Sequence, residues 1–200
     1  MSDTYRRVFY KSACNIFMKI YISTLLLAVL LLWTNPVTGK VYLTKDDALK
    51  QAFPDAPTID RLNIFLTDED IKQAQELSKV KVESKLFTYY AARGKGNEII
   101  GYAVFESHIV RTKPEVFMAV INRTGEIDYL EILAFYEPPE YIPPKRWLDL
   151  FKGRRLDDKL RVKSGISAIS GASITGEGIT RAVRNILAIF ELKILKKEGK

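Results

Sequence analysis

The sequence is poor in side chains that bind metals or form disulfides. Its 200 residues include one cysteine, Cys14, and one histidine, His108. Residues 40–200 therefore contain no thiol, which excludes disulfides, cysteine-ligated zinc, iron–sulfur clusters and c-type haem attachment from that part of the chain. Any redox chemistry there has to come from an organic cofactor.

Several sequence motifs for nucleotide and hydrolase chemistry are also missing. The chain has no G-x-x-x-x-G-K-[ST] loop, no G-x-G-x-x-G after a strand and no G-x-S-x-G elbow. A serine–histidine catalytic pair would have to use His108. The net charge is +7, but acidic and basic residues alternate along most of the chain. We therefore expect no nucleic-acid partner.

An uncharged apolar run occupies residues 20–34, and basic residues precede it. The positive-inside rule then predicts a location in the bacterial inner membrane, with the following domain facing the periplasm. The run of about 15 residues is short for a span, so a retained anchor and a cleaved signal both remain open. We divide the chain into a cytoplasmic stub with an anchor or signal segment, residues 1–39, and an exported domain, residues 40–200.

The hydrophobic pattern of the exported part predicts an α+β domain with an antiparallel sheet flanked by helices. Thr44 and Thr67 are typical N-caps of two short helices. Short turns connect four expected strands, which implies antiparallel pairing. These strands cover residues 86–92, 99–110, 116–121 and 127–135, and helices are expected at 147–151 and 179–190.

A segment of small residues, 164–180, leads directly into the last apolar helix. It contains four glycines and, before position 176, five serine or threonine hydroxyls. Helix N-termini carry unpaired N–H groups and favour anions, so this segment is a candidate phosphate-binding loop. A capped helix preceded by a flexible loop is the alternative interpretation.

The motif Ser170-Gly171-Ala172-Ser173, with Thr175 two residues later, resembles the S-G-A-[ST]-x-[ST] signature of the FMN-binding domain family. That family includes flavin-carrying subunits of the sodium-translocating NADH:quinone oxidoreductase and of Rnf-type complexes. In it, a flavin transferase esterifies the last residue of S-G-A-[ST] with the phosphate of FMN. The resemblance implies that Ser173 is the acceptor and that all five residues bind the cofactor.

A second segment resembles the same family. Glu137-Pro138-Pro139-Glu140-Tyr141 stands where the family has E-T-P-G, which adds Glu137 to the cofactor-binding residues. Two positions depart from the family pattern. Ser167 replaces an aspartate three residues before S-G-A, and the acceptor is serine where threonine is usual.

The flavin ring needs an apolar wall and a few polar contacts. Tyr136, Tyr141 and Trp147 are candidates for the wall, although aromatic residues at such positions also serve as core. Arg111 and Lys113 are expected on one face of a strand, where they could offset phosphate charge or form an ordinary solvated strand end.

These observations favour an FMN-dependent electron carrier at the membrane. The expected partners are a flavin transferase and either membrane redox complex subunits or other electron carriers. No catalytic residue or metal ligand is predicted. One alternative is a flavin-free, membrane-tethered sensor or assembly subunit that keeps the fold. Another is a flavin enzyme that reduces a small substrate.

Overall fold

The computed structural model describes residues 22–24 and 39–196, and it forms two compact units, residues 1–37 and 38–200. Residues 22–24 are helical, and the rest of the expected anchor or signal segment lies outside the described residues. Within the described residues, no helix combines the length and the apolar character needed to cross a membrane. The following paragraphs concern the second unit.

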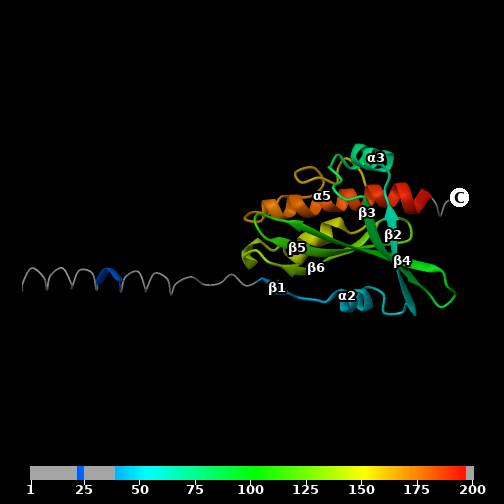
Figure 1. Cartoon of the computed structure of the whole chain (residues 1–200), viewed down its shortest axis with the longest axis horizontal. Helices are drawn as coiled ribbons and strands as arrows, with labels where there is room; N and C mark the ends of the chain where they lie inside the picture. Colours follow the sequence, from blue (N-terminus) through cyan, green and yellow to red (C-terminus); the bar gives the residue numbers. More distant parts are fainter. Residues whose placement is uncertain (1–21, 25–38, 197–200) are drawn as a thin grey trace, which may run out of the picture. The chain divides into compact units, whose positions relative to one another are not determined.

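A six-stranded antiparallel sheet forms the centre of this unit (Figure 1). Its strand order is β1-β6-β5-β4-β3-β2. The α+β prediction and the four expected strands are confirmed, and β1 and β2 are additional. The strands are β1 Lys40–Val41, β2 Thr58–Phe65, β3 Leu86–Arg93, β4 Ile99–Ile109, β5 Pro114–Ile121 and β6 Ile127–Phe135.

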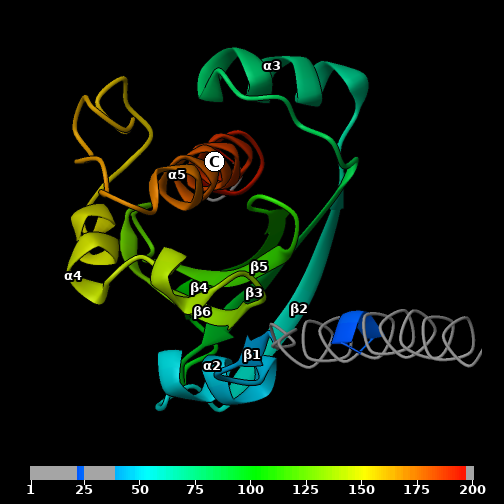
Figure 2. The same ribbon diagram turned by 90° about the vertical axis from the view of Figure 1, so that its left-hand side faces the viewer.

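Helices cover both faces of the sheet (Figure 2). The long helix α5, Ser173–Phe190, lies on one face and packs against α3, Asp68–Ser78. On the other face lies α2, Lys45–Ala52. The Thr44 and Thr67 hydroxyls both accept an N–H bond from the first turn of their helix, as predicted. The remaining helical elements are short: η1 Pro139–Tyr141, α4 Lys145–Leu148, η2 Asp149–Phe151 and the π-helical η3 Glu191–Leu195.

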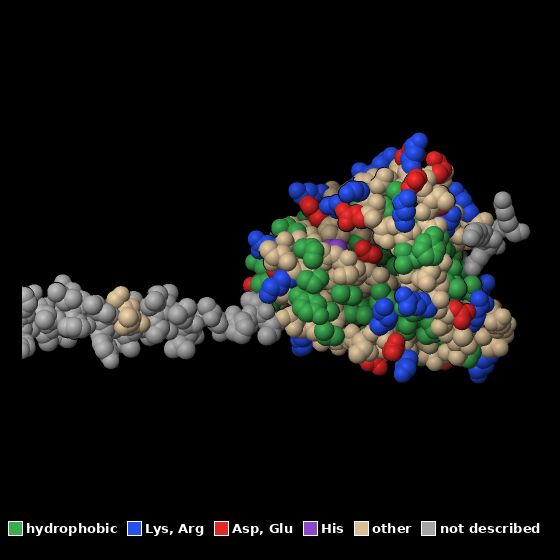
Figure 3. Space-filling view, viewed as in Figure 1, with side chains coloured by type: hydrophobic (Ala, Val, Ile, Leu, Met, Phe, Trp, Pro, Cys, Tyr) green, Lys and Arg blue, Asp and Glu red, His purple; other side chains and the backbone are tan. Residues whose placement is uncertain are grey.

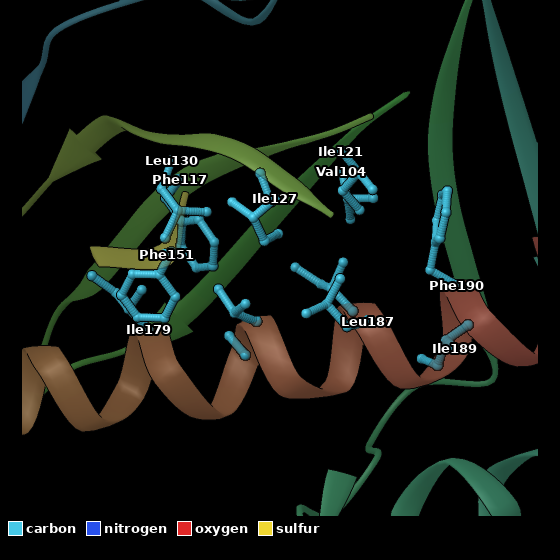
Figure 4. Close-up of a cluster of buried hydrophobic side chains, with 14 of the residues drawn as sticks. Val104, Phe117, Ile121, Ile127, Leu130, Phe151, Ile179, Leu187, Ile189 and Phe190 are labelled. Carbon is cyan, nitrogen blue, oxygen red and sulfur yellow. The ribbon is translucent and has the colours of Figure 1, made fainter. Parts of the chain in front are cut away.

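Strict alternation along the central strands creates two hydrophobic cores. Phe117, Ala119 and Ile121 of β5 face α5, whereas Met118 and Val120 between them face α2. Figure 4 shows sheet residues and α5 residues of the first core pointing toward each other. Burying a side chain of this size stabilises the fold by about 1.5–3 kcal/mol. The α5 contact therefore fixes the helix firmly on the sheet.

The last helix begins earlier than its apolar stripe indicates. Regular helical spacing in the sequence starts at Ile179, but α5 starts at Ser173 and includes Gly176 and Gly178. Gly176 lies against the indole of Trp147, where an added Cβ would stand 3.2 Å from Cζ2. The glycine-containing first turns thus belong to the helix and allow close packing beneath it.

Candidate functional site

The N-terminus of α5 lacks a side-chain cap. Its N-cap residue is Ala172, whose methyl group accepts no hydrogen bond, and no other side chain caps the first turn. The backbone N–H groups of the first turn have no intrahelical partners, and the helix dipole adds positive potential at this end. This end of α5 can therefore bind an anionic group.

The backbone just before the helix is open to a ligand. Gly171 has φ +84°, a conformation that other residues rarely adopt. Apart from its two chain neighbours, no described residue has a heavy atom within 4 Å of where the Cβ would be. Ser170 and Gly171 are exposed, whereas Ala172 is buried and holds the end of the loop to the core. A bulky group can thus approach the main chain at Gly171.

The hydroxyls of the motif differ in their accessibility. Ser173 is exposed at the first position of α5, and its Oγ donates a hydrogen bond to the carbonyl of Ile169 at 3.0 Å. Thr175 is only 1% exposed. A ligand on the solvent side reaches the Ser173 hydroxyl directly, whereas the Thr175 side chain lies inside the fold.

Trp147 supports the loop from below. Its indole Nε1 donates a hydrogen bond to the Ser167 carbonyl at 2.7 Å, and its ring contacts Phe151 edge-on at 5.2 Å between centroids. The side chain is only 4% exposed. The structure therefore places Trp147 in the core beneath the loop, which is the second of the two roles considered for it. Nothing in the sequence pairs Trp147 with Ser167.

Glu137 organises the turn between β4 and β5. Its Oε1 accepts bonds from the N–H groups of Arg111, Thr112 and Lys113 at 3.3, 2.6 and 2.8 Å, and from the Thr112 hydroxyl at 3.1 Å. Bonds from Thr112 and Lys113 hold the pKa of Glu137 below its ordinary value. The N–H groups of the turn therefore keep the carboxylate ionised, and the carboxylate in turn holds the turn in shape.

The expectation that Arg111 and Lys113 share a strand face is wrong. Strand β4 ends at Ile109 and β5 begins at Pro114, so both residues lie in the turn. Capture of their N–H groups by Glu137 bends the chain there. The Arg111 guanidinium lies 5.1 Å from the ring centroid of Tyr141, which brings together two of the expected flavin contacts. Tyr136 packs against Gly39 instead.

A cleft runs along α5 from its N-terminal half. It has a volume of about 600 Å³ and lies between α5, β4 and the segment that follows α3. Gly178, Arg181 and Asn185 line it from α5, and Glu106 and His108 line it from β4. The sequence gives no signal for this cleft, because its walls come from three segments that are far apart in the chain, residues 80–87, 106–109 and 178–189.

The turn and the loop lie at the same end of the molecule. His108, the last but one residue of β4, packs against Gly178, where an added Cβ would stand 2.5 Å from its Nε2. Gly178 follows Ser173 by five residues on α5, and the Glu137-bound turn begins three residues after His108. One end of the sheet therefore carries both segments of the predicted site.

Residues 111–188 match the family model described as the FMN-binding domain. These residues form an FMN-binding domain. The match begins at the turn and includes Glu137, the Ser170–Ser173 loop and most of α5. The predicted family and the predicted cofactor, FMN, are confirmed.

The fold of the FMN-binding domain is also that of a solved structure. The crystal structure of NqrC from Shewanella oneidensis superposes with a TM-score of 0.52 at 17% sequence identity. The alignment covers 80% of this chain and 92% of that one. No curated protein matches the sequence.

The residues of the loop fit the phosphate end of FMN. A phosphate monoester carries a charge of about −1.5 to −2 at neutral pH, and the uncapped first turn of α5 offers N–H donors and a favourable dipole. Exposed hydroxyls at Ser170 and Ser173 flank the open backbone of Gly171. The assignment of individual binding residues stays a prediction.

Proposed function

We propose that this protein is a membrane-targeted electron carrier whose FMN is esterified through its phosphate to Ser173. The observation that carries the proposal is the exposed Ser173 hydroxyl at the first position of a helix without a side-chain cap. A phosphoryl group on this Oγ would lie beside the unpaired N–H groups of the first turn. The dipole at such a position stabilises a negative charge by about 0.3–1 kcal/mol at the surface.

The other hydroxyls of the loop suit attachment less well. Ser170 is exposed but precedes Gly171, outside the helix, so its oxygen has no fixed relation to the first-turn N–H groups. Thr175 is buried, so a transferase would have to open the first turn to reach it. Position and access together favour Ser173.

Attachment requires a flavin transferase and an activated donor. With a flavin dinucleotide as donor, the Ser173 hydroxyl loses its proton and forms a bond to the flavin-side phosphorus. The phosphoanhydride bond breaks and the second nucleotide leaves. Esterification also removes the hydrogen bond from Oγ to the Ile169 carbonyl, because the oxygen no longer carries a proton.

Bound FMN supplies one- and two-electron chemistry, and the protein sets its position and surroundings. The Glu137-bound turn holds Arg111 over Tyr141, which places a cation beside an aromatic ring at the same end of the sheet as Ser173. In the family that this chain resembles, such domains serve membrane redox complexes. Together with the apolar run at residues 20–34, this supports partners that are membrane redox subunits or other electron carriers.

The test is to produce the full chain together with a flavin transferase in an export-competent host. We expect flavin fluorescence on a denaturing gel and a mass increase on the peptide that contains Ser173. Ser173→Ala should lose both signals, and the control Ser164→Ala, which removes an exposed hydroxyl outside the motif, should keep them. A wild-type chain without added mass would contradict covalent attachment, and an unchanged adduct in Ser173→Ala would assign it to another hydroxyl.

A flavin-free sensor or assembly subunit is the second candidate function. Two sequence features favour it: Ser167 replaces the family's aspartate, and the E-T-P-G segment is altered after Glu137. The absorbance of the full chain purified from its native membrane separates the candidates. A flavin spectrum supports the carrier, and a colourless protein supports the alternative.

A further inference from the structure

A pair of titratable side chains lies between the sheet and α5, and the electron-carrier proposal gives it no role. His108 of β4 and Glu115 of β5 are direct partners in the antiparallel register. Both point to the α5 side of the sheet, because Phe117 and Val104 at the same alternation belong to the core beneath α5. Glu106 lies on the same face of β4, two residues before His108.

Glu115 is completely buried, and His108 is its ionic partner. The His108 Nε2 lies 3.3 Å from Oε2 of Glu115, and the exposed fractions of the two side chains are 18% and 0%. Within the described residues, none of the four polar atoms makes a hydrogen bond of good geometry. A buried carboxylate so poorly solvated favours a bound proton, either on its own oxygen or on the adjacent imidazole.

The protonation equilibria of this pair are perturbed by the surroundings. Burial raises the pKa of Glu115, and the contact with His108 only partly opposes this effect. Burial likewise raises the pKa of Glu106, and the charge of His108 opposes it. No group of three or more acidic, histidine or cysteine side chains in the described part of the chain could hold a metal ion. A proton is therefore the ligand that this pair suits.

The pair adjoins both solvent and the helix that would carry the flavin. His108 lines the cleft of about 600 Å³, and the space-filling view of Figure 3 shows histidine surface, in purple, on this face of the molecule. The ring also packs against Gly178. Five residues of helix separate Gly178 from Ser173, which is a rise of about 7.5 Å along the axis. Protons can thus enter from the cleft, and the helix start that would carry the flavin lies close to the pair.

The other charged groups around the cleft do not neutralise Glu115. Two of these groups are acidic and two are basic, so their charges balance one another. These groups are Glu106 of β4, Arg181 of α5, and Lys81 and Glu83 of the segment after α3. A further negative charge near α5 would therefore increase the affinity of the pair for protons.

We propose that His108 and Glu115 form a proton-binding site that takes up one proton when FMN on Ser173 is reduced. The proposal rests on the electron-carrier function. Two electrons from a reduced redox partner and one proton convert the flavin ring to its reduced anion, which adds one negative charge. One proton from solvent then binds to the pair through the cleft and offsets that charge. The total uptake is two protons for two electrons.

The first measurement uses the single histidine of the chain. The single imidazole can be removed by His108→Gln without affecting any other histidine. Because the contact with His108 opposes the effect of burial on Glu115, we expect the titration of the Glu115 carboxyl, followed by carbon NMR in flavin-free protein, to move to higher pH in His108→Gln. The control Glu98→Gln removes an exposed carboxylate next to the other end of β4 and should leave the Glu115 titration unchanged. An unshifted Glu115 titration in His108→Gln overturns the coupled pair.

The second measurement is the midpoint potential of FMN-loaded protein as a function of pH. The slope should correspond to two protons per two electrons in the wild type and in Glu98→Gln, and to one proton in Glu115→Gln and His108→Gln. Equal slopes in all four proteins overturn the proton-uptake proposal while leaving the carrier function standing. A chain that acquires no FMN overturns the carrier function and the redox role of the pair, and the Glu115 titration still reports whether the pair is coupled.

Discussion

Replacing Trp147 with phenylalanine removes one hydrogen bond that positions the loop before α5. The change removes the indole N–H that donates to the Ser167 carbonyl at 2.7 Å, and phenylalanine keeps an aromatic ring beside Phe151. Ser167 is an exposed residue, so water can reach part of its freed carbonyl. The hydrogen bond then contributes about 0.5–1.5 kcal/mol. Loss of ring volume beneath Gly176 adds a packing cost, which brings the total to about 1–2 kcal/mol.

Chemical denaturation followed by circular dichroism measures this loss in the free energy of unfolding, and thermal denaturation measures the change in Tm. For a domain of this size, each kcal/mol lowers Tm by about 2–4 °C, so we expect Tm to decrease by about 2–8 °C in Trp147→Phe. Without this hydrogen bond the loop is less well positioned, so a smaller fraction of the protein molecules should carry covalent FMN at equal expression. In the proposed attachment reaction, the transferase would act on Ser173, six residues after the carbonyl that Trp147 holds.

Phe151→Leu is the matched control for loop position. Phe151 is fully buried beside Trp147, so this change lowers stability by a comparable amount without removing the bond to Ser167. We expect FMN loading close to that of the wild type. Equal loading in Trp147→Phe and Phe151→Leu, or a stability change below about 0.5 kcal/mol in Trp147→Phe, would refute the positioning role.

Three further changes test other contacts, two in the candidate site and one that holds α5 in the fold. Gly171→Ala places a side chain at φ +84° in open space, so we expect a loss of about 1–2 kcal/mol from backbone strain, measured by denaturation, together with reduced FMN loading. The folded-state pKa of Glu137 is lowered, so its stabilising contribution is present above the ordinary value of 4.5 and disappears as pH falls through the folded-state pKa; Glu137→Gln should flatten the acid side of a Tm–pH profile. Arg184 donates to the carbonyls of Ser78, Asp157 and Leu160 from a side chain only 3% exposed. Arg184→Met leaves these carbonyls without their donor and should cost about 1–3 kcal/mol in denaturation experiments.

The elements with strong local signals could be predicted from the sequence. Strands β3 to β6 combine apolar runs with short turns, and Thr44 and Thr67 cap their helices as their neighbours indicate. Strand β2 gave no such signal. It is an edge strand in which exposed residues such as Phe65, at 76% exposure, interrupt any alternation between apolar and polar positions. Its pairing with β3 determines its structure, and pairing is not visible in a local pattern.

The site shows the same division between local and distant information. The Ser170–Ser173 loop could be found because small residues precede an apolar helix within one continuous segment. Glu137, in contrast, acts on a turn 24 to 26 residues earlier, and Trp147 acts on a carbonyl 20 residues later. The prediction that Arg111 and Lys113 lie in a strand is wrong because Glu137 bends the chain at these residues. A carboxylate so distant in the sequence leaves no local signal.

The contact between His108 and Gly178 joins these separate features into one site. Any other residue at position 178 would bring a Cβ against the imidazole, so glycine there lets β4 approach the first turns of α5. That approach brings the buried Glu115, the Glu137-bound turn and the uncapped helix end to the same end of the sheet. The redox group proposed for Ser173 and the proton site proposed for His108 and Glu115 would then act through one short stretch of α5. Electrostatic coupling between them needs no movement of the fold, because both are attached to elements that share a single hydrophobic core.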